Sequence, residues 1–223
     1  MQNLLGALQF ADSFFPSGSI AFSWGLETLR ADAEVGSPAE IAQFLEGQLL
    51  HRWAVFDAPL VIAATRSAGK FERLAELDEL AEAMTLASEL REGSRRAGAS
   101  LLKVHEGLGT TGAAEYRQEV MQRRARGHLA VMQGMLWTAT GLSEDDCRAV
   151  SAHTLCTGIV GAALRLGMIG HLDAQKILLQ VRPALLELLE LPTPPAGEIC
   201  SYTPHAEIAA MRHEVQDSRL FAN

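Results

Sequence analysis

Strand-forming residues are scarce in this 223-residue sequence, which contains 10 valines and 8 isoleucines against 34 alanines and 32 leucines. Alanine and leucine cost least in a helix, whereas strands favour β-branched side chains. No segment alternates between apolar and polar residues as a half-buried strand does. Prolines are absent between Pro59 and Pro183, which suits long helices. We therefore expect an all-α protein, a single globular domain over residues 1–223 with roughly eight to ten helices.

Cysteine and positive charge are also scarce. Three cysteines are too few for a disulfide scaffold and indicate a reducing compartment. The 19 basic residues, 16 of them arginine, are outnumbered by 27 acidic residues, and the net charge of −8 disfavours nucleic acids and anionic membranes as partners. The uncharged stretch over residues 149–164 is shorter than the roughly 20 residues of a membrane-spanning helix. The N-terminus lacks the basic region of a secretory signal. We expect a cytoplasmic protein with no nucleic-acid or membrane partner.

Local signals place the helices. Ser37-Pro38-Ala39-Glu40 combines an N-cap serine, a proline in the first turn and a glutamate that completes a capping box. Ser143 is followed by three acidic residues and is a second N-cap. With the apolar periodicity, these signals predict helices over 4–11, from Ser37, from Asp57 to Gly69, over 71–105 with possible breaks at Gly93 and Gly98, over 113–140, over 143–166, from Asp173 to 191 with a kink or restart at Pro183, and from Thr203.

Two motifs resemble catalytic or nucleotide-binding signatures but lack the required context. Gly107–Gly112 matches G-x-G-x-x-G, yet it follows a helix end rather than a strand, so an interhelical loop is favoured over a dinucleotide site. Ser23 lies in a sequence one glycine short of the G-x-S-x-G nucleophile elbow, and no βαβ pattern surrounds it. Helix packing is the favoured interpretation of the Ser23 sequence.

His153 and Cys156 are three residues apart on one predicted helical face, a spacing that places two metal ligands side by side. Two ligands do not complete a metal site, so a polar pair at a helix interface is favoured. We expect no permanent metal site and no cofactor. A nickel carrier that uses His153, Cys156 and His213 stays open as an alternative, as does a helical hydrolase that uses Ser23 or Cys156 with His153.

Arg165 interrupts an otherwise apolar, glycine- and alanine-rich run, TGIVGAALRLGMIG. An arginine removed from water needs a carboxylate partner, because an uncompensated buried charge costs several kcal/mol. Two interpretations follow: either the side chain extends to solvent at a helix end, or it joins a buried charge network with acidic residues of other helices.

The last thirteen residues, MRHEVQDSRLFAN, are too short to fold alone, yet they end in the apolar pair Leu220 and Phe221. A fraying terminus normally lacks such residues. An exposed tail with arginine and phenylalanine anchors suggests insertion into a pocket of a partner.

Several segments together are similar to the UreF family of urease accessory proteins. The similarity spans nearly the whole chain and is carried by residues 15–27 (FPSGSIAFSWGLE), HRWAVFDAPL around Asp57, residues 86–98 (LASELREGSRRAG), residues 162–170 (AALRLGMIG) and the C-terminal TPHAEIAAMRHEVQDSRLFAN.

The resemblance implies an all-α protein that forms a homodimer within a complex, binds a UreD/UreH-type accessory protein and the GTPase UreG, and helps deliver nickel to apo-urease. It implies no catalytic residue in this chain, so we do not expect an enzyme. A GTPase-gating charge network is implied for Glu27, Asp57, Glu89 and Arg165. Partner binding, with residues 212–223 as the docking tail, is implied for Pro16, Gly18, Arg212, His213, Glu214, Ser218, Arg219, Leu220 and Phe221.

Overall fold

A computed structural model describes residues 1–18, 22–216 and 219–221. Over these residues the chain is helical without a strand, which confirms the all-α expectation. The helices are α1 (Gln2–Ala11), α2 (Leu26–Ala31), α3 (Pro38–Gln48), α4 (Ala58–Thr65), α5 (Phe71–Met84), α6 (Ser88–Gly107), α7 (Ala113–Met121), α8 (Leu129–Ala139), α9 (Glu144–Arg165), α10 (His171–Glu190) and α11 (Pro204–His213), with a 3₁₀ turn at Ala196–Glu198.

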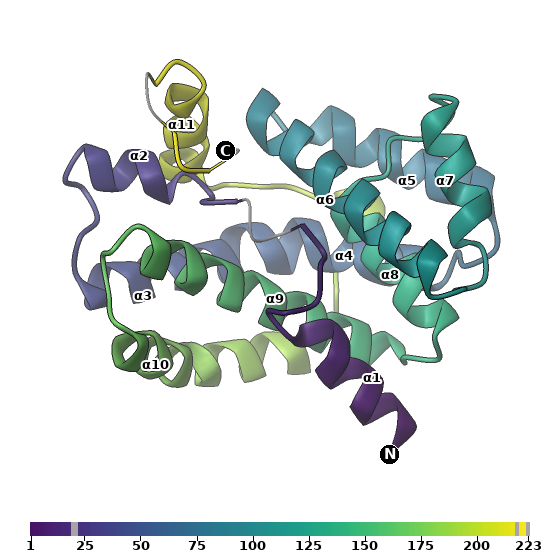
Figure 1. Cartoon of the computed structure of the whole chain (residues 1–223), viewed down its shortest axis with the longest axis horizontal. Coiled ribbons are helices and arrows are strands. Elements are labelled where there is room, and N and C mark those ends of the chain that lie inside the picture. The colour runs from purple at the N-terminus through teal and green to yellow at the C-terminus, as the bar shows by residue number, and fades with distance from the viewer. Residues whose placement is uncertain (19–21, 217–218, 222–223) are drawn as a thin grey trace.

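Two apolar clusters form the core, one on each side of the molecule (Figure 1). The first cluster lies among α4, α5, α6 and α8 and includes Leu60, Leu101 and Trp137. The second lies among α2, α3, α9 and α10 and includes Leu45 and Ile159. Helix α9 contacts elements of both clusters. It is long and apolar enough to cross a membrane, but 56% of its apolar window is buried inside the fold, as in a core helix.

Local signals fixed the starts of two long helices as predicted. Ser37 accepts a hydrogen bond from the Glu40 amide, and the Glu40 carboxylate accepts one from the Ser37 amide at 2.9 Å. The same reciprocal box joins Ser143 and Asp146 at the start of α9. Each box uses only residues three apart, so no distant partner is needed.

The predicted break at Asp57 is absent. Residues 49–57 form a π-helix, η2 (Leu49–Asp57), which joins α3 to α4 in one continuous rod, so the described residues form ten helical rods. The wider π turn frees backbone carbonyls, and the extended segment after the 3₁₀ turn uses two of them. The Cys200 amide donates to the Val55 carbonyl at 3.1 Å, and the Tyr202 amide donates to the His51 carbonyl at 3.0 Å.

Three further helix predictions are corrected by the structure. The chain breaks between α5 and α6 at Thr85–Ala87, not at Gly93 or Gly98, which lie inside α6. The predicted helix 113–140 is two helices, because buried Asp78 accepts the amides of Gly127 and His128 at 2.8 and 2.7 Å and so begins α8 there. Helix α10 starts after Gly170, with Asp173 in its first turn, and continues through Pro183 without a restart.

Candidate functional site

The described C-terminal residues, 213–216 and 219–221, fold back onto α2, α6 and α9 instead of extending into solvent (Figure 1). We call the segment 214–221, as far as it is described, the tail. A tight turn prepares its docking place: Trp24 (φ +56°) and Gly25 (φ +82°) both have left-handed backbone conformations just before α2 begins. A Cβ atom on Gly25 would lie 2.7 Å from the Ala206 carbonyl oxygen, so only glycine lets α11 pack this closely on the turn.

His213 lies at the centre of the site, between two carboxylates from different helices. Its side chain is fully buried at the end of α11. The ring Nδ1 atom is 2.9 Å from Glu89 Oε2 of α6, and Nε2 is 3.0 Å from Glu27 Oε2 of α2. The histidine therefore ties α11 to the two helices that flank it.

The same two carboxylates bind the tail. The backbone amides of Leu220 and Phe221 donate to the Glu27 carboxylate at 2.7 and 3.0 Å, and Arg219 Nη1 donates to Glu89 Oε1 at 3.2 Å. The Phe221 side chain is only 6% exposed and belongs to the second apolar cluster. We call the arrangement of His213, Glu27, Glu89 and the tail the clasp.

The structure corrects the expectation that Phe221 is an exposed anchor. In this chain Phe221 is buried against its own core, whereas Leu220 is exposed, as expected. Two other predicted partner-binding residues form intramolecular contacts: Arg212 pairs with Asp32 at 2.7 Å, and Glu214 accepts a hydrogen bond from Ser88 Oγ at 3.0 Å. Ser218, which also belongs to the predicted docking set, lies outside the described residues.

Arg165 does not join the predicted carboxylate network. It is exposed at the last residue of α9, and no carboxylate contacts it among the described residues. Its guanidinium lies 4.3 Å from the centre of the Phe221 ring, and Nε donates to the Gly161 carbonyl at 3.2 Å. Partial desolvation lowers the pKa of this guanidinium. The cation thus reaches solvent at a helix end. It is linked to Glu27 only indirectly, because it contacts the Phe221 ring and the Phe221 amide binds Glu27.

Asp57 is separate from the clasp and pairs with Arg52, which is not among the predicted site residues. The π-helix brings these residues, five apart, to 3.2 Å between Nε and Oδ2, a contact that an α-helix does not favour. Burial raises the pKa of the Asp57 carboxyl, and the charge of Arg52 opposes that shift. The signal that could have identified Arg52 is its place within the apolar run LLHRWAVF.

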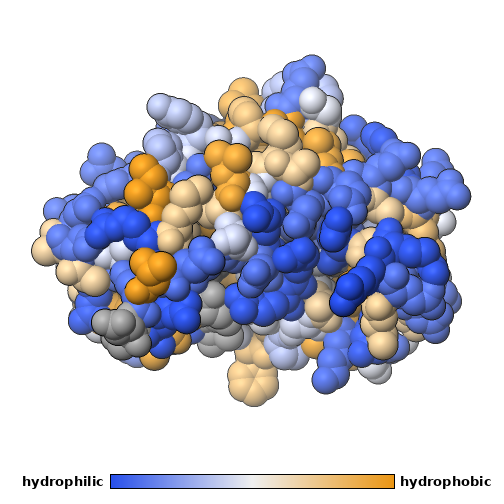
Figure 2. All heavy atoms as spheres, turned by 90° about the horizontal axis from the view of Figure 1, so that it is seen from above, coloured by the Kyte–Doolittle hydropathy of each residue, from blue (hydrophilic) through white to orange (hydrophobic). Residues whose placement is uncertain are grey.

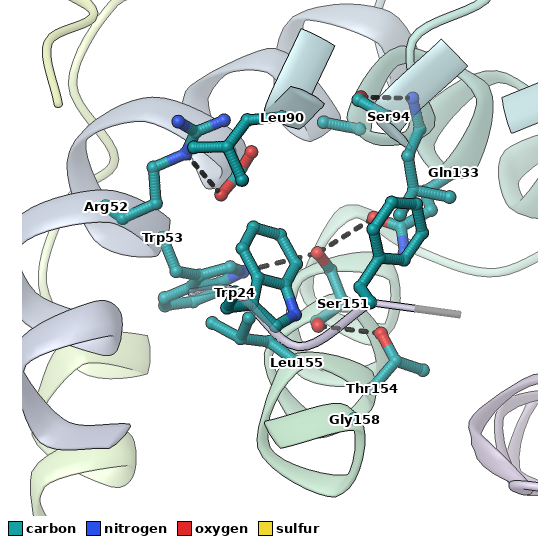
Figure 3. Close-up of a pocket in the computed structure, with 14 residues that line it drawn as sticks. Trp24, Arg52, Trp53, Leu90, Ser94, Gln133, Ser151, Thr154, Leu155 and Gly158 are labelled. Atoms are coloured by element: carbon teal, nitrogen blue, oxygen red, sulfur yellow. Dashed lines mark hydrogen bonds and ion pairs between the residues drawn. The ribbon is translucent and has the colours of Figure 1, made fainter. Parts of the chain in front are cut away.

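Arg52 and Asp57 line a narrow cavity of about 50 Å³ (Figure 3). A chain of hydrogen bonds crosses the same cavity from Trp53: its Nε1 donates to Ser151 Oγ at 3.2 Å, and Ser151 donates to Gln133 Oε1 at 3.0 Å. The volume is well below the roughly 300 Å³ of a typical small-molecule site. The polar side chains that line this cavity therefore form an internal hydrogen-bond network.

Pro16 and Gly18 lie in the loop after α1, which packs on α6 and lines a cavity of about 490 Å³ together with Arg165 of α9. Ser100 Oγ of α6 donates to the Pro16 carbonyl at 3.1 Å. Gly18 has a left-handed conformation (φ +77°), and a Cβ atom there would lie 3.0 Å from Ser100 Cβ. Both residues thus fix the course of this loop, and their role in partner binding stays a prediction.

The other motifs show no assembled chemical site. Gly107 is the last residue of α6, and residues 108–112 join α6 to α7 as an interhelical loop. Burial raises the pKa of the Cys156 thiol to about 12, so the nucleophilic thiolate is disfavoured. His213 has both ring nitrogens occupied by Glu27 and Glu89 rather than facing His153 and Cys156. Among the described residues, no group of three or more His, Cys, Asp or Glu side chains is arranged to hold a metal ion.

Exposed apolar residues lie on the outer side of α11 and in the tail. Figure 2 shows a mostly hydrophilic surface that hydrophobic residues interrupt on the side of α2 and α11. Ile208, Met211 and Val215 have helical spacing and are 55%, 42% and 83% exposed, and Leu220 is 64% exposed. The buried side of α11, which carries Ala206, Ala209, Ala210 and His213, faces the fold. We call the exposed residues Ile208, Met211, Val215 and Leu220 the outer stripe.

Comparison with known proteins gives one consistent family. The UreF family model matches residues 35–182. The chain is 34% identical to the urease accessory protein UreF of Trichodesmium erythraeum, an alignment that covers 98% of this chain and 96% of the relative. It is 32% identical to the protein of that name from Haemophilus influenzae Rd, over 97% of this chain and 94% of the relative. The chain is 29% identical to the urease accessory protein UreF of Kocuria rhizophila, an alignment that covers 99% of this chain and 97% of the relative.

Proposed function

Because the chain belongs to the UreF family of urease accessory proteins, we propose that it is a docking scaffold for assembly of the urease nickel centre. In this proposal it binds a UreD/UreH-type accessory protein and the GTPase UreG, and the complex delivers nickel to apo-urease. The chain catalyses no reaction itself and works in the cytoplasm, where its influence on UreG controls GTP hydrolysis.

The outer stripe is the observation that carries the proposal. A helix with one face buried and the opposite face apolar and exposed leaves that second face available for a partner. The clasp fixes this surface to the fold on its buried side, since the His213 ring and the Leu220 and Phe221 amides are all hydrogen-bonded to Glu27. The UreD/UreH-type protein is therefore proposed to bind the outer stripe while the tail stays closed.

The gating role is proposed for the clasp as a unit rather than for a direct Arg165–carboxylate pair. Arg165 contacts the Phe221 ring, and Glu27 binds the Phe221 amide, so the tail connects the end of α9 to α2 and α6. A change in the tail therefore alters the surroundings of Arg165 and of both glutamates together. Asp57 would act independently, through Arg52 and the cavity.

A homodimer within the complex is supported by the free face of α10. Leu172, Leu179 and Leu186 are spaced seven residues apart and are 69%, 57% and 55% exposed. That spacing places the three leucines along one helix face, as at a helix–helix interface. We propose this face as the dimer contact.

The test of partner docking is co-purification of the chain with its UreD/UreH-type partner. Val215→Glu puts a charge into the outer stripe and is expected to reduce the recovered partner at least roughly tenfold, because burying an unpaired charge is costly. The matched control is Leu108→Glu, which alters a 56%-exposed leucine after α6. Equal recovery with both variants would refute docking at the outer stripe.

The gating role is tested separately with Arg165→Ala. The measurements are urease activation and GTP hydrolysis by UreG in the reconstituted complex. Lower activation with intact partner binding supports the proposal. Normal activation and hydrolysis by a folded Arg165→Ala variant would leave Arg165 with a structural role only.

A further inference from the structure

The buried ring of His213 presents a protonation problem, because both of its nitrogens face carboxylates. Nδ1 is 2.9 Å from Glu89 and Nε2 is 3.0 Å from Glu27. A neutral imidazole carries hydrogen on one nitrogen only, and an ionised carboxylate donates none. The observed arrangement is therefore fully satisfied by the imidazolium form, which donates from both nitrogens.

The charges of the clasp lead to the same conclusion. Glu27 and Glu89 bring two negative charges, and Arg219 supplies one positive charge at 3.2 Å from Glu89. A protonated His213 makes the cluster neutral. A neutral His213 leaves one uncompensated negative charge in a largely buried place, with a ring lone pair directed at a carboxylate oxygen.

We infer that His213 is a proton-operated latch for the C-terminal tail. With the ring protonated, Glu27 and Glu89 are held in place and bind Arg219 and the amides of Leu220 and Phe221. Loss of the proton breaks one of the two ring contacts and leaves the glutamates in mutual repulsion. The tail then leaves the clasp, Phe221 comes out of the apolar cluster, and Arg165 loses its ring contact.

The direction of the pH effect follows from the groups around the ring. Glu27 of α2 and Glu89 of α6 contact it directly, and both favour the positive form. The nearest cation in the clasp is Arg219, whose charge is shared with Glu89. Further outward, Arg212 pairs with Asp32 and Arg165 stacks on Phe221, while Glu214 accepts a hydrogen bond from Ser88 and keeps its negative charge. The tail is therefore closed while His213 carries its second ring proton and the glutamates are ionised, and it opens when the ring loses that proton.

This inference concerns the isolated chain, so it stands or fails independently of the proposed partners. Hydrogen exchange of the tail amides is measured in the full chain between about pH 6 and about pH 8.5, with correction for the intrinsic pH dependence of exchange. The protection factors of the Leu220 and Phe221 amides are expected to fall roughly tenfold or more over this range, because a hydrogen bond to a charged group is lost.

Two variants make the test specific. His213→Gln cannot donate to carboxylates on both sides, so its tail is expected to show low protection at every pH. His205→Gln is the matched control, since His205 lies on the same helix and contacts Glu34 away from the clasp. It is expected to keep the pH dependence of the native chain.

A measurement on the unaltered protein avoids any folding defect of the variants. Nitrogen-15 NMR of the histidine rings follows each proton directly, and His213 is expected to lose its proton over the same pH interval in which the tail opens. Tail protection that does not change with pH would overturn the inference. So would a neutral His213 ring in a closed tail, or unchanged pH dependence in His213→Gln.

Discussion

Replacing Gly25 with alanine is expected to detach α11 from α2 while the core helices remain folded. The alanine must adopt the left-handed conformation at φ +82°, which costs about 1–2 kcal/mol. Its Cβ atom would lie 2.7 Å from the Ala206 carbonyl oxygen and 3.1 Å from Ala209 Cβ, so α11 must move outward. Overpacking of this kind costs about 1–3 kcal/mol. The two costs together give about 2–5 kcal/mol.

The cost should appear in the local opening of α11, because the strained contact joins this helix to the turn before α2. Hydrogen exchange of the α11 amides measures that opening, and about 2 kcal/mol corresponds to roughly a 30-fold loss of protection. Amides of α8 and α9, in the two apolar clusters, report whether the rest of the fold is intact.

Gly36→Ala is the matched control. A Cβ atom at Gly36 meets no atom within 4 Å, and the residue lies in the loop just before α3. Its effect should stay within about 0.5 kcal/mol. If α11 exchanges at the same rate in Gly25→Ala as in the native chain, the close approach at Gly25 does not hold α11 in place.

Two further predictions concern buried titratable groups. Burial raises the pKa of Asp78 from 3.8 to about 6, so its stabilising contribution is complete below about pH 4 and is lost as the pH rises through 6. The free energy of unfolding, measured with urea, should therefore change less with pH in Asp78→Asn than in the native chain. The difference should be on the order of 3 kcal/mol between about pH 4 and about pH 6, and parallel profiles would contradict this. Burial raises the pKa of Cys156 to about 12, whereas Cys200 is exposed. Iodoacetamide at about pH 8 should therefore modify Cys200 first, and equal rates in the native protein would show that Cys156 is accessible.

Much of the clasp could be named from the sequence, but its connections could not. The family resemblance selected Glu27, Glu89, His213, Arg219 and Phe221, and these five residues meet in the structure. The same resemblance paired the glutamates with Arg165, in agreement with the argument that an arginine in an apolar run needs a carboxylate. The partner in the fold is a histidine more than 120 residues from either glutamate, a separation that no local pattern encodes.

The sequence by itself determined the helical class and the starts of α3 and α9. An excess of alanine and leucine lowers the cost of helix at every position, and a capping box needs only residues three apart. The break before α8 was decided by tertiary structure, because Asp78, about fifty residues earlier, binds the Gly127 and His128 amides. The closing of the tail was decided in the same way, since Glu27 must lie beside Phe221 before it can bind that amide. Hydrogen bonds between neighbours in the chain form from local geometry, whereas these bonds exist only once packing has brought distant segments together.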